Sequence, residues 1–85
     1  PMPNTFTPNG DGLNDEFKPF EKNVSEYKLT IYNNFGVNIF ESNDIGFGWD
    51  GNFNGKVIQG SYIYILDFTL NGKKVKQKGK FLLIK

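Results

Sequence analysis

Apolar and polar residues alternate along residues 27–32, which is the pattern of a half-buried β-strand. Residues 61–70 are predicted to form the longest strand, a central one that is covered on both sides at its start, because both of its faces are apolar at first and one becomes polar further along. The buried face of the first strand is predicted to carry Tyr27, Leu29 and Ile31. Residues 37–42 are predicted to return beside the first strand and to form a hairpin with it. No stretch of about 10–12 residues shows the helical period, so helices are not expected.

Turn dipeptides separate these strands from shorter ones. Asn54-Gly55 and Asn71-Gly72 are typical of type I′ hairpin turns, and residues 33–36 are predicted to form another turn. Gly79 is predicted to mark a β-bulge. Further short strands are predicted at residues 5–7, 56–58, 73–76 and 81–84. About seven strands at close spacing predict one all-β domain over residues 1–85, an immunoglobulin-like antiparallel β-sandwich.

Aromatic residues make up 16% of the 85 residues, and such rings bury much apolar area in a small core, to which Phe17 and Phe20 are expected to contribute. The chain contains neither histidine nor cysteine, which excludes Ser-His-Asp and Cys-His catalytic sites and zinc sites built on those residues. Asp11, Asp15 and Glu16 supply carboxylates, but a glycosidase needs two of them across a cleft. We therefore expect no enzymatic activity. No apolar run approaches the roughly 20 residues of a membrane-spanning helix, so no transmembrane segment is expected.

Charge is distributed unevenly along the chain. Residues 1–50 hold three lysines against eight carboxylates, and residues 51–85 hold seven lysines against one aspartate. This asymmetry indicates either a polar partner surface or two halves that interleave in a sandwich and neutralise each other. All ten basic residues are lysines, so bidentate reading of phosphate or guanine, and hence nucleic-acid binding, is not expected. A ribbon of lysines is formed by Lys73, Lys74, Lys76, Lys78 and Lys80. It either protects an edge strand against unwanted pairing or contacts an acidic protein or an anionic lipid surface.

The segment of residues 9–15 concentrates oxygen-bearing side chains and glycine in a predicted loop. Asn9, Asp11 and Asp15 have the spacing of half a calcium loop, although the bidentate glutamate of an EF-hand has no counterpart because position 20 is Phe20. The alternative is a turn that its own Asn and Asp side chains brace. Calcium is therefore a possible ligand here, and no other cofactor is expected.

Four segments in order along the chain resemble one family. Residues 2–17 resemble its opening, PNAFTPNGDGxNDxF, and residues 33–42 resemble NRWGxxVFES. Residues 49–64 resemble WDGxxxGxxxxxGxYxY with one residue fewer between Gly55 and Gly60, and residues 79–85 resemble GxVTLIR. The family is the gliding-motility-associated C-terminal domain of Bacteroidetes, which is the type B sorting domain of the type IX secretion system.

The resemblance implies a C-terminal sorting signal within a larger exported protein, with gliding adhesins as typical cargo. The outer-membrane translocon, or an accessory protein of the PorP/SprF kind, would recognise the domain, and the cargo would reach the cell surface or the medium. The isolated domain is expected to be a monomer. The expected recognition residues are Asn9, Asp11, Asn14, Asp15, Asn33, Asn34, Phe35, Gly36, Phe81, Leu82, Leu83, Ile84 and Lys85. Structural roles are expected for Trp49, Asp50, Gly51, Gly60 and Tyr62.

The chain departs from the family pattern at two places. Asn34-Phe35 stands where the family has Arg-Trp or Arg-Tyr, and Lys85 stands where it has arginine. If the translocon reads a guanidinium at these sites, it would bind this chain more weakly. An alternative function is an adhesive immunoglobulin-like module that binds polysaccharide or a neighbouring domain, with Trp49 and tyrosines as contacts.

Overall fold

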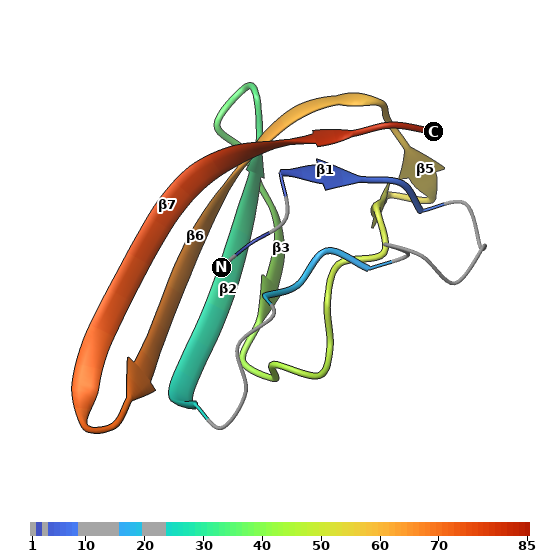
Figure 1. Ribbon diagram of the computed structural model, residues 1–85. Coiled ribbons are helices and arrows are strands. Elements are labelled where there is room, and N and C mark those ends of the chain that lie inside the picture. Colours follow the sequence, from blue (N-terminus) through green and yellow to red (C-terminus); the bar gives the residue numbers. More distant parts are fainter. Residues whose placement is uncertain (1, 3, 9–15, 20–23) are drawn as a thin grey trace.

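The computed structural model describes residues 2, 4–8, 16–19 and 24–85, which contain seven strands and no helix. The strands are β1 (Thr5–Phe6), β2 (Ser25–Asn33), β3 (Asn38–Ser42), β4 (Asn52–Phe53), β5 (Lys56–Val57), β6 (Gly60–Leu70) and β7 (Lys73–Leu83). Five form one sheet in the order β1-β7-β6-β2-β3, and β4 pairs with β5 (Figure 1). The predicted all-β fold of about seven strands is confirmed. Within the described ranges, no helix is long and apolar enough to cross a membrane.

The sheet is built on the two predicted hairpins. β6 and β7 pair antiparallel along their whole length, and Asn71 and Gly72 between them have φ values of 53° and 78°, as a type I′ turn requires. β2 pairs antiparallel with both β3 and β6. The short edge strand β1 instead runs parallel to the end of β7, which is the one departure from antiparallel pairing among the described strands.

Irregular chain, rather than a regular second sheet, covers the inner face of the five-stranded sheet. Residues 16–19 and 43–51 lie against it, followed by the small β4–β5 sheet (Figure 1). Two backbone hydrogen bonds join the irregular segments, from Phe17 N to Trp49 O at 2.7 Å and from Trp49 N to Phe17 O at 3.0 Å. The arrangement is therefore sandwich-like, with a second layer that a single bridge holds together.

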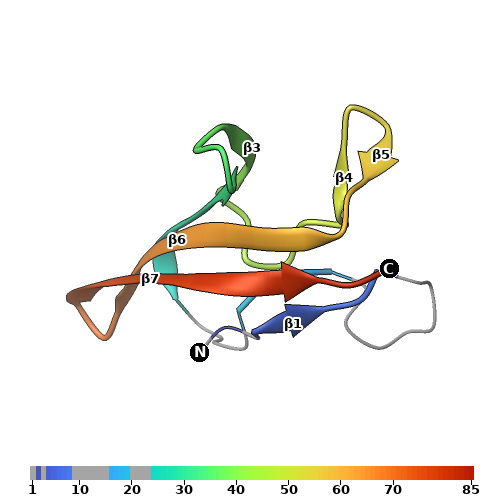
Figure 2. The same cartoon turned by 90° about the horizontal axis from the view of Figure 1, so that it is seen from above.

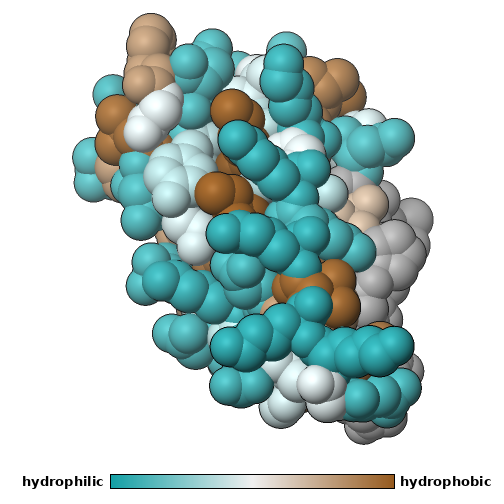
Figure 3. Space-filling model, turned by 90° about the vertical axis from the view of Figure 1, so that its left-hand side faces the viewer, coloured by the Kyte–Doolittle hydropathy of each residue, from teal (hydrophilic) through white to brown (hydrophobic). Residues whose placement is uncertain are grey.

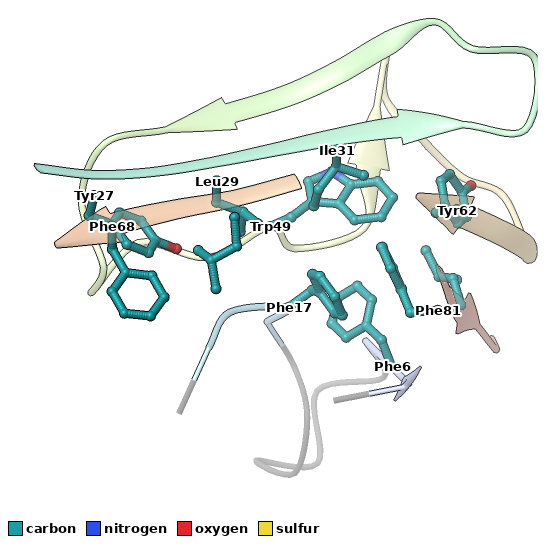
Figure 4. Close-up of a cluster of buried hydrophobic side chains, with 11 residues drawn as sticks. Phe6, Phe17, Tyr27, Leu29, Ile31, Trp49, Tyr62, Phe68 and Phe81 are labelled. Carbon is teal, nitrogen blue, oxygen red and sulfur yellow. The ribbon is translucent and has the colours of Figure 1, made fainter. Parts of the chain in front are cut away.

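Aromatic rings fill the space between the two layers. The buried apolar residues are Phe6, Phe17, Tyr27, Leu29, Ile31, Trp49, Tyr62, Leu66, Phe68, Phe81 and Leu83. At one end of this core, the rings of Phe17 and Phe81 stack with centroids 3.6 Å apart, and Trp49 meets Tyr62 edge-on at 5.0 Å (Figure 4). Phe20, which the sequence also assigned to the core, lies outside the described residues.

The irregularity of the sheet lies in β2 and not in β7. The pairing of β6 with β7 continues without a shift through Gly79, so the predicted bulge there is wrong. Gly79 instead lies opposite Tyr64, and a Cβ at this position would be 2.8 Å from the Tyr64 hydroxyl oxygen. The Tyr64 ring therefore lies over Gly79, and a larger residue here would have to displace that ring. The register of β2 against β6 shifts near Glu26, a non-glycine residue with φ 52°.

Tyr27 has a buried hydroxyl with no hydrogen-bond partner among the described residues. Burial, assisted by the charge of Asp44, raises the pKa of this hydroxyl from 10.0 to about 12. An unfolded chain would release the proton near pH 10, whereas the folded chain would hold it. The free energy of unfolding contributed by this group is therefore present below pH 10 and is lost as the pH rises towards 12.

We expect Tyr27→Phe to raise the free energy of unfolding at pH 7 by up to about 1 kcal/mol, because it removes an unpaired buried hydroxyl. Above pH 10 the advantage of the variant should grow by about a further 1 kcal/mol, since phenylalanine cannot ionise in either state. Urea titrations of both proteins at pH 7 and pH 11 measure the difference. A variant that is less stable than the parent by 1 kcal/mol or more at pH 7 would show that the hydroxyl is satisfied.

Candidate recognition site

The turn at residues 33–36 displays an aromatic side chain on a braced backbone. Asn33 Oδ1 accepts hydrogen bonds from the backbone N–H groups of Phe35 at 2.9 Å and Val37 at 3.0 Å. Gly36 N donates to Asn33 O at 3.0 Å, and Gly36 has φ 82°, which is the geometry of a type I turn closed by a glycine bulge. Phe35 at the tip is 86% exposed. The braced backbone of the turn therefore presents a large apolar ring to solvent.

The β4–β5 hairpin stands opposite this turn. Asn54 and Gly55 have φ values of 54° and 78°, so the predicted type I′ turn is confirmed. The chain then passes through Ile58, which is 58% exposed, before β6 begins. The Tyr62 hydroxyl donates a hydrogen bond to Ile58 O and fixes this corner, and burial raises the pKa of that hydroxyl.

A groove of about 230 Å³ separates the turn from the hairpin. Figure 2 shows both rising on the same side of β6. The lining of the groove is mainly apolar with a few amide groups, and Lys56 is the one charged residue in that lining. The lining residues are Asn33, Asn34, Phe35, Ile39, Gly51, Phe53, Lys56, Ile58, Gln59, Gly60, Ser61 and Tyr62. An apolar groove with convergent amide groups is suited to hold an apolar side chain of a partner and to fix the backbone next to it.

The last five residues divide between the core and the surface. Phe81 is 2% exposed and Leu83 is fully buried, so both face the core, whereas Leu82 is 47% and Ile84 is 41% exposed. The backbone N–H of Lys85 donates to Gln59 Oε1 at 3.2 Å. Because Gln59 lines the groove, the structure brings the end of the chain and the 33–36 turn to the same end of the sheet.

The Trp-Asp-Gly segment forms the wall of the core behind the groove. Trp49 is 1% exposed, and its indole N–H donates to Asn52 O at 3.0 Å. Asp50 Oδ1 accepts a hydrogen bond from Asn52 N at 2.9 Å and braces the loop. Gly51 has φ 91°. Burial leaves the indole no surface on which a sugar ring could stack, which removes the main contact of the adhesive alternative.

Gly60 and Tyr62 lie where the chain enters β6. Gly60 has φ 154°, and a Cβ at this position would meet nothing within 4 Å among the described atoms. Tyr62 is 6% exposed, and its ring stacks on Phe81 with centroids 5.6 Å apart. Both residues line the groove.

The loop of residues 9–15 lies outside the described residues, so its recognition residues and its possible calcium ligands stay predictions. These are Asn9, Asp11, Asn14 and Asp15. Among the residues that are described, no group of three or more acidic side chains is placed to hold a metal ion.

Sequence reasoning missed the hairpin side of the groove. Phe53, Lys56, Ile58 and Gln59 line it, although the sequence suggested only a short strand and a turn there. One signal was present, because Ile58 is an apolar residue at the end of a short predicted strand that begins directly after the Asn54-Gly55 turn.

Comparison with known proteins supports a single family. No curated protein and no solved structure gives a significant match to this chain. A family model described as a type IX secretion signal domain matches residues 1–84, which is nearly the whole length, and this is a family of secretion signals rather than of enzymes. The chain therefore belongs to the type IX secretion signal domain family.

Proposed function

We propose that this domain acts as a C-terminal sorting signal that directs a larger cargo protein through the outer-membrane translocon to the cell surface or the medium. Membership of the secretion signal family supports export by the type IX system. The observation that carries the mechanism is the groove between the 33–36 turn and the β4–β5 hairpin. It places the 86% exposed Phe35, on a braced backbone, at the rim of a mainly apolar groove, and a contiguous apolar surface of this kind is typical of a protein-binding site.

Recognition in this proposal is the docking of a fixed surface on an outer-membrane protein. An accessory protein of the PorP/SprF kind is the proposed partner. Phe35 enters a pocket of that protein, while an apolar partner side chain enters the groove beside Ile58. Leu82, Ile84 and Lys85 extend the contact along the end of the chain. Contacts from the loop of residues 9–15 follow from the family resemblance.

Asn34-Phe35 replaces the arginine–aromatic pair typical of the family, which changes the expected chemistry of the contact. Without a guanidinium, the turn offers an amide and a ring, and burial of the ring becomes the main source of binding energy. Interfaces usually depend on a few such buried anchors rather than on the whole contact area.

Export of a reporter tests the proposal. A fluorescent protein with an inner-membrane signal peptide is fused to residues 1–85 and expressed in a host with a type IX system. We expect the fusion to reach the surface or medium and Phe35→Ala to reduce the exported fraction about tenfold or more, since loss of a central aromatic anchor costs about 2 kcal/mol or more. The cellular pool of each variant is measured alongside to exclude loss by degradation.

Phe47→Ala is the matched control, because Phe47 is also an exposed aromatic residue, at 58%, but does not line the groove. It should leave export unchanged. Equal export of both variants and the parent would remove the groove from the mechanism. Failure of the unmutated fusion to leave the cell would contradict the sorting role itself.

A further inference from the structure

The strand β7 presents a long open edge. β6 pairs with it along all eleven residues, but on its other side β1 pairs only with Leu82 and Leu83. No other described residue pairs with β7 on that side. Figure 1 shows the lower two-thirds of β7 as the outermost ribbon of the sheet. An open row of backbone donors and acceptors of this length is a template for an additional strand.

The direction of the free backbone groups follows from the pairing at the top of β7. Leu82 N donates to Asn4 O at 3.1 Å and Ile84 N donates to Phe6 O at 2.9 Å. Because successive residues of a strand direct their backbone groups to opposite sides, the even-numbered residues of β7 direct theirs towards the open edge. Below β1 these residues are Lys74, Lys76, Lys78 and Lys80.

The same four residues place their side chains on the exposed face of the sheet. The odd-numbered neighbours Val75, Gln77 and Phe81 are half-buried or buried towards the core, whereas all the even-numbered lysines are exposed. Figure 3, viewed from the side of β7, shows mainly hydrophilic side chains with a few apolar patches between them. Each free backbone position on this edge therefore carries an ammonium group beside it.

The charge on this edge has little compensation. β7 contains no acidic residue, and none of its lysines forms an ion pair with a described carboxylate. Asp67 lies across from Lys76 on β6 and offsets it in part. Lys78 and Lys80 lie across from Ile65 and Ile63, so their charges face apolar side chains.

We propose that the open edge of β7 binds an extended acidic segment of a partner protein as an added strand, with a carboxylate at every second residue. In that register each free N–H and C=O pair of β7 gains a backbone partner, and each lysine faces a carboxylate about 5 Å away between Cβ atoms. A second copy of β7 is excluded, because its lysines would lie opposite lysines. The lysines of β7 thus oppose pairing of two β7 edges with each other, and the same charges favour an acidic strand.

This surface is separate from the groove, and the proposal does not depend on the sorting role. An anionic lipid headgroup would also attract the lysines but has no backbone groups to pair with the edge. The experiment must therefore test whether binding requires alternating carboxylates and whether the backbone groups of the β7 edge become paired.

Amide hydrogen exchange of the 85-residue chain, measured residue by residue by NMR, tests the proposal. The probe is a blocked seven-residue peptide with glutamate at every second position and threonine or valine between. A peptide of the same composition with its glutamates clustered at one end is the control, and vesicles containing phosphatidylglycerol are the second control. We expect the alternating peptide to slow exchange at the amides of Lys74, Lys76, Lys78 and Lys80 at least about tenfold.

Charge reversal on the edge completes the test. Lys78→Glu should weaken binding of the alternating peptide about tenfold or more, whereas Lys18→Glu, in the opposite layer, should leave it unchanged. Equal protection by the clustered peptide, binding of vesicles without peptide binding, or protection confined to β3 would each overturn the proposal. Loss of the β6–β7 cross-strand signals in Lys78→Glu would identify misfolding, and Lys80→Glu then replaces it.

Discussion

Replacement of Trp49 by alanine is expected to lower the free energy of unfolding by about 4 kcal/mol. Trp49 is 1% exposed and is among the largest fully buried side chains of the described core. A chain of this length has a total stability on the order of 4–13 kcal/mol. The substitution should therefore remove between about a third and all of the stability of the domain.

The expected effect is large because Trp49 joins the two layers. Its ring contacts Phe6 at 5.9 Å and Tyr62 at 5.0 Å between centroids, and its backbone exchanges two hydrogen bonds with Phe17. Removal of the ring would leave a cavity between the irregular layer and the sheet. Since that layer contains few backbone hydrogen bonds of its own, loss of the ring should loosen the β4–β5 hairpin as well.

Urea unfolding followed by circular dichroism measures the effect. Trp49→Phe, which keeps a ring but loses the indole N–H bond to Asn52, should cost only about 1–2 kcal/mol. Phe47→Ala removes an exposed ring and should cost less than about 1 kcal/mol. A loss of less than 1 kcal/mol in Trp49→Ala would show that the indole does not hold the layers together.

Gly51→Ala is expected to cost about 2–4 kcal/mol, which is the second largest effect. Gly51 has φ 91°, where a side chain is strained, and a Cβ there would lie 2.9 Å from Pro8 Cγ and 3.4 Å from Leu83 Cδ1. Because Gly51 also lines the groove, movement of this loop would change the site.

Gly72→Ala separates the cost of backbone strain from the cost of the steric contact with Pro8 and Leu83. Gly72 has a similar φ of 78°, but nothing described lies within 4 Å of its Cβ position, so it should cost only about 1 kcal/mol of backbone strain. The effect of alanine on the unfolded chain is the same at both positions and cancels in the comparison. Thermal unfolding of both variants gives the difference, and equal losses would mean that Pro8 does not press on this site.

Local patterns predicted most strands and turns of the main sheet, although residues 73–76 and 81–84, which were predicted as two short strands, belong to the single strand β7. Alternation at Tyr27, Leu29 and Ile31 identified the buried face of β2, and all three side chains are buried. Asn54-Gly55 and Asn71-Gly72 identified type I′ turns because the required positive φ is a property of those residues themselves.

Features that depend on distant contacts could not be predicted. The role of Gly79 is set by a ring on the neighbouring strand, and the sequence around it cannot distinguish that contact from a bulge. The register of β2 shifts near Glu26, which is a non-glycine residue with positive φ. The local propensity of glutamate does not indicate such a conformation. The parallel pairing of β1 likewise depends on where β7 ends.

In the candidate site, too, the features set by local residues were predicted and those set by distant contacts were not. The 33–36 turn was predicted from its residues, and the family resemblance indicated its role. The groove was not predicted, because Phe35 and Ile58 are 23 positions apart in the sequence and line one groove only in the folded chain. The end of the chain was assigned to recognition as a block, whereas the alternation of β7 buries Phe81 and Leu83 and exposes Leu82 and Ile84.

Site-specific photo-crosslinking in a type IX-secreting host tests most directly whether another protein binds the 33–36 turn and the groove beside it during export. A photoreactive phenylalanine analogue is placed at position 35 of the reporter fusion, and at position 47 in a second fusion. Position 35 should give an adduct with an outer-membrane protein of the secretion apparatus, and position 47 should give little or none. Efficient export with no adduct from position 35, or with an equal adduct from position 47, would contradict the account.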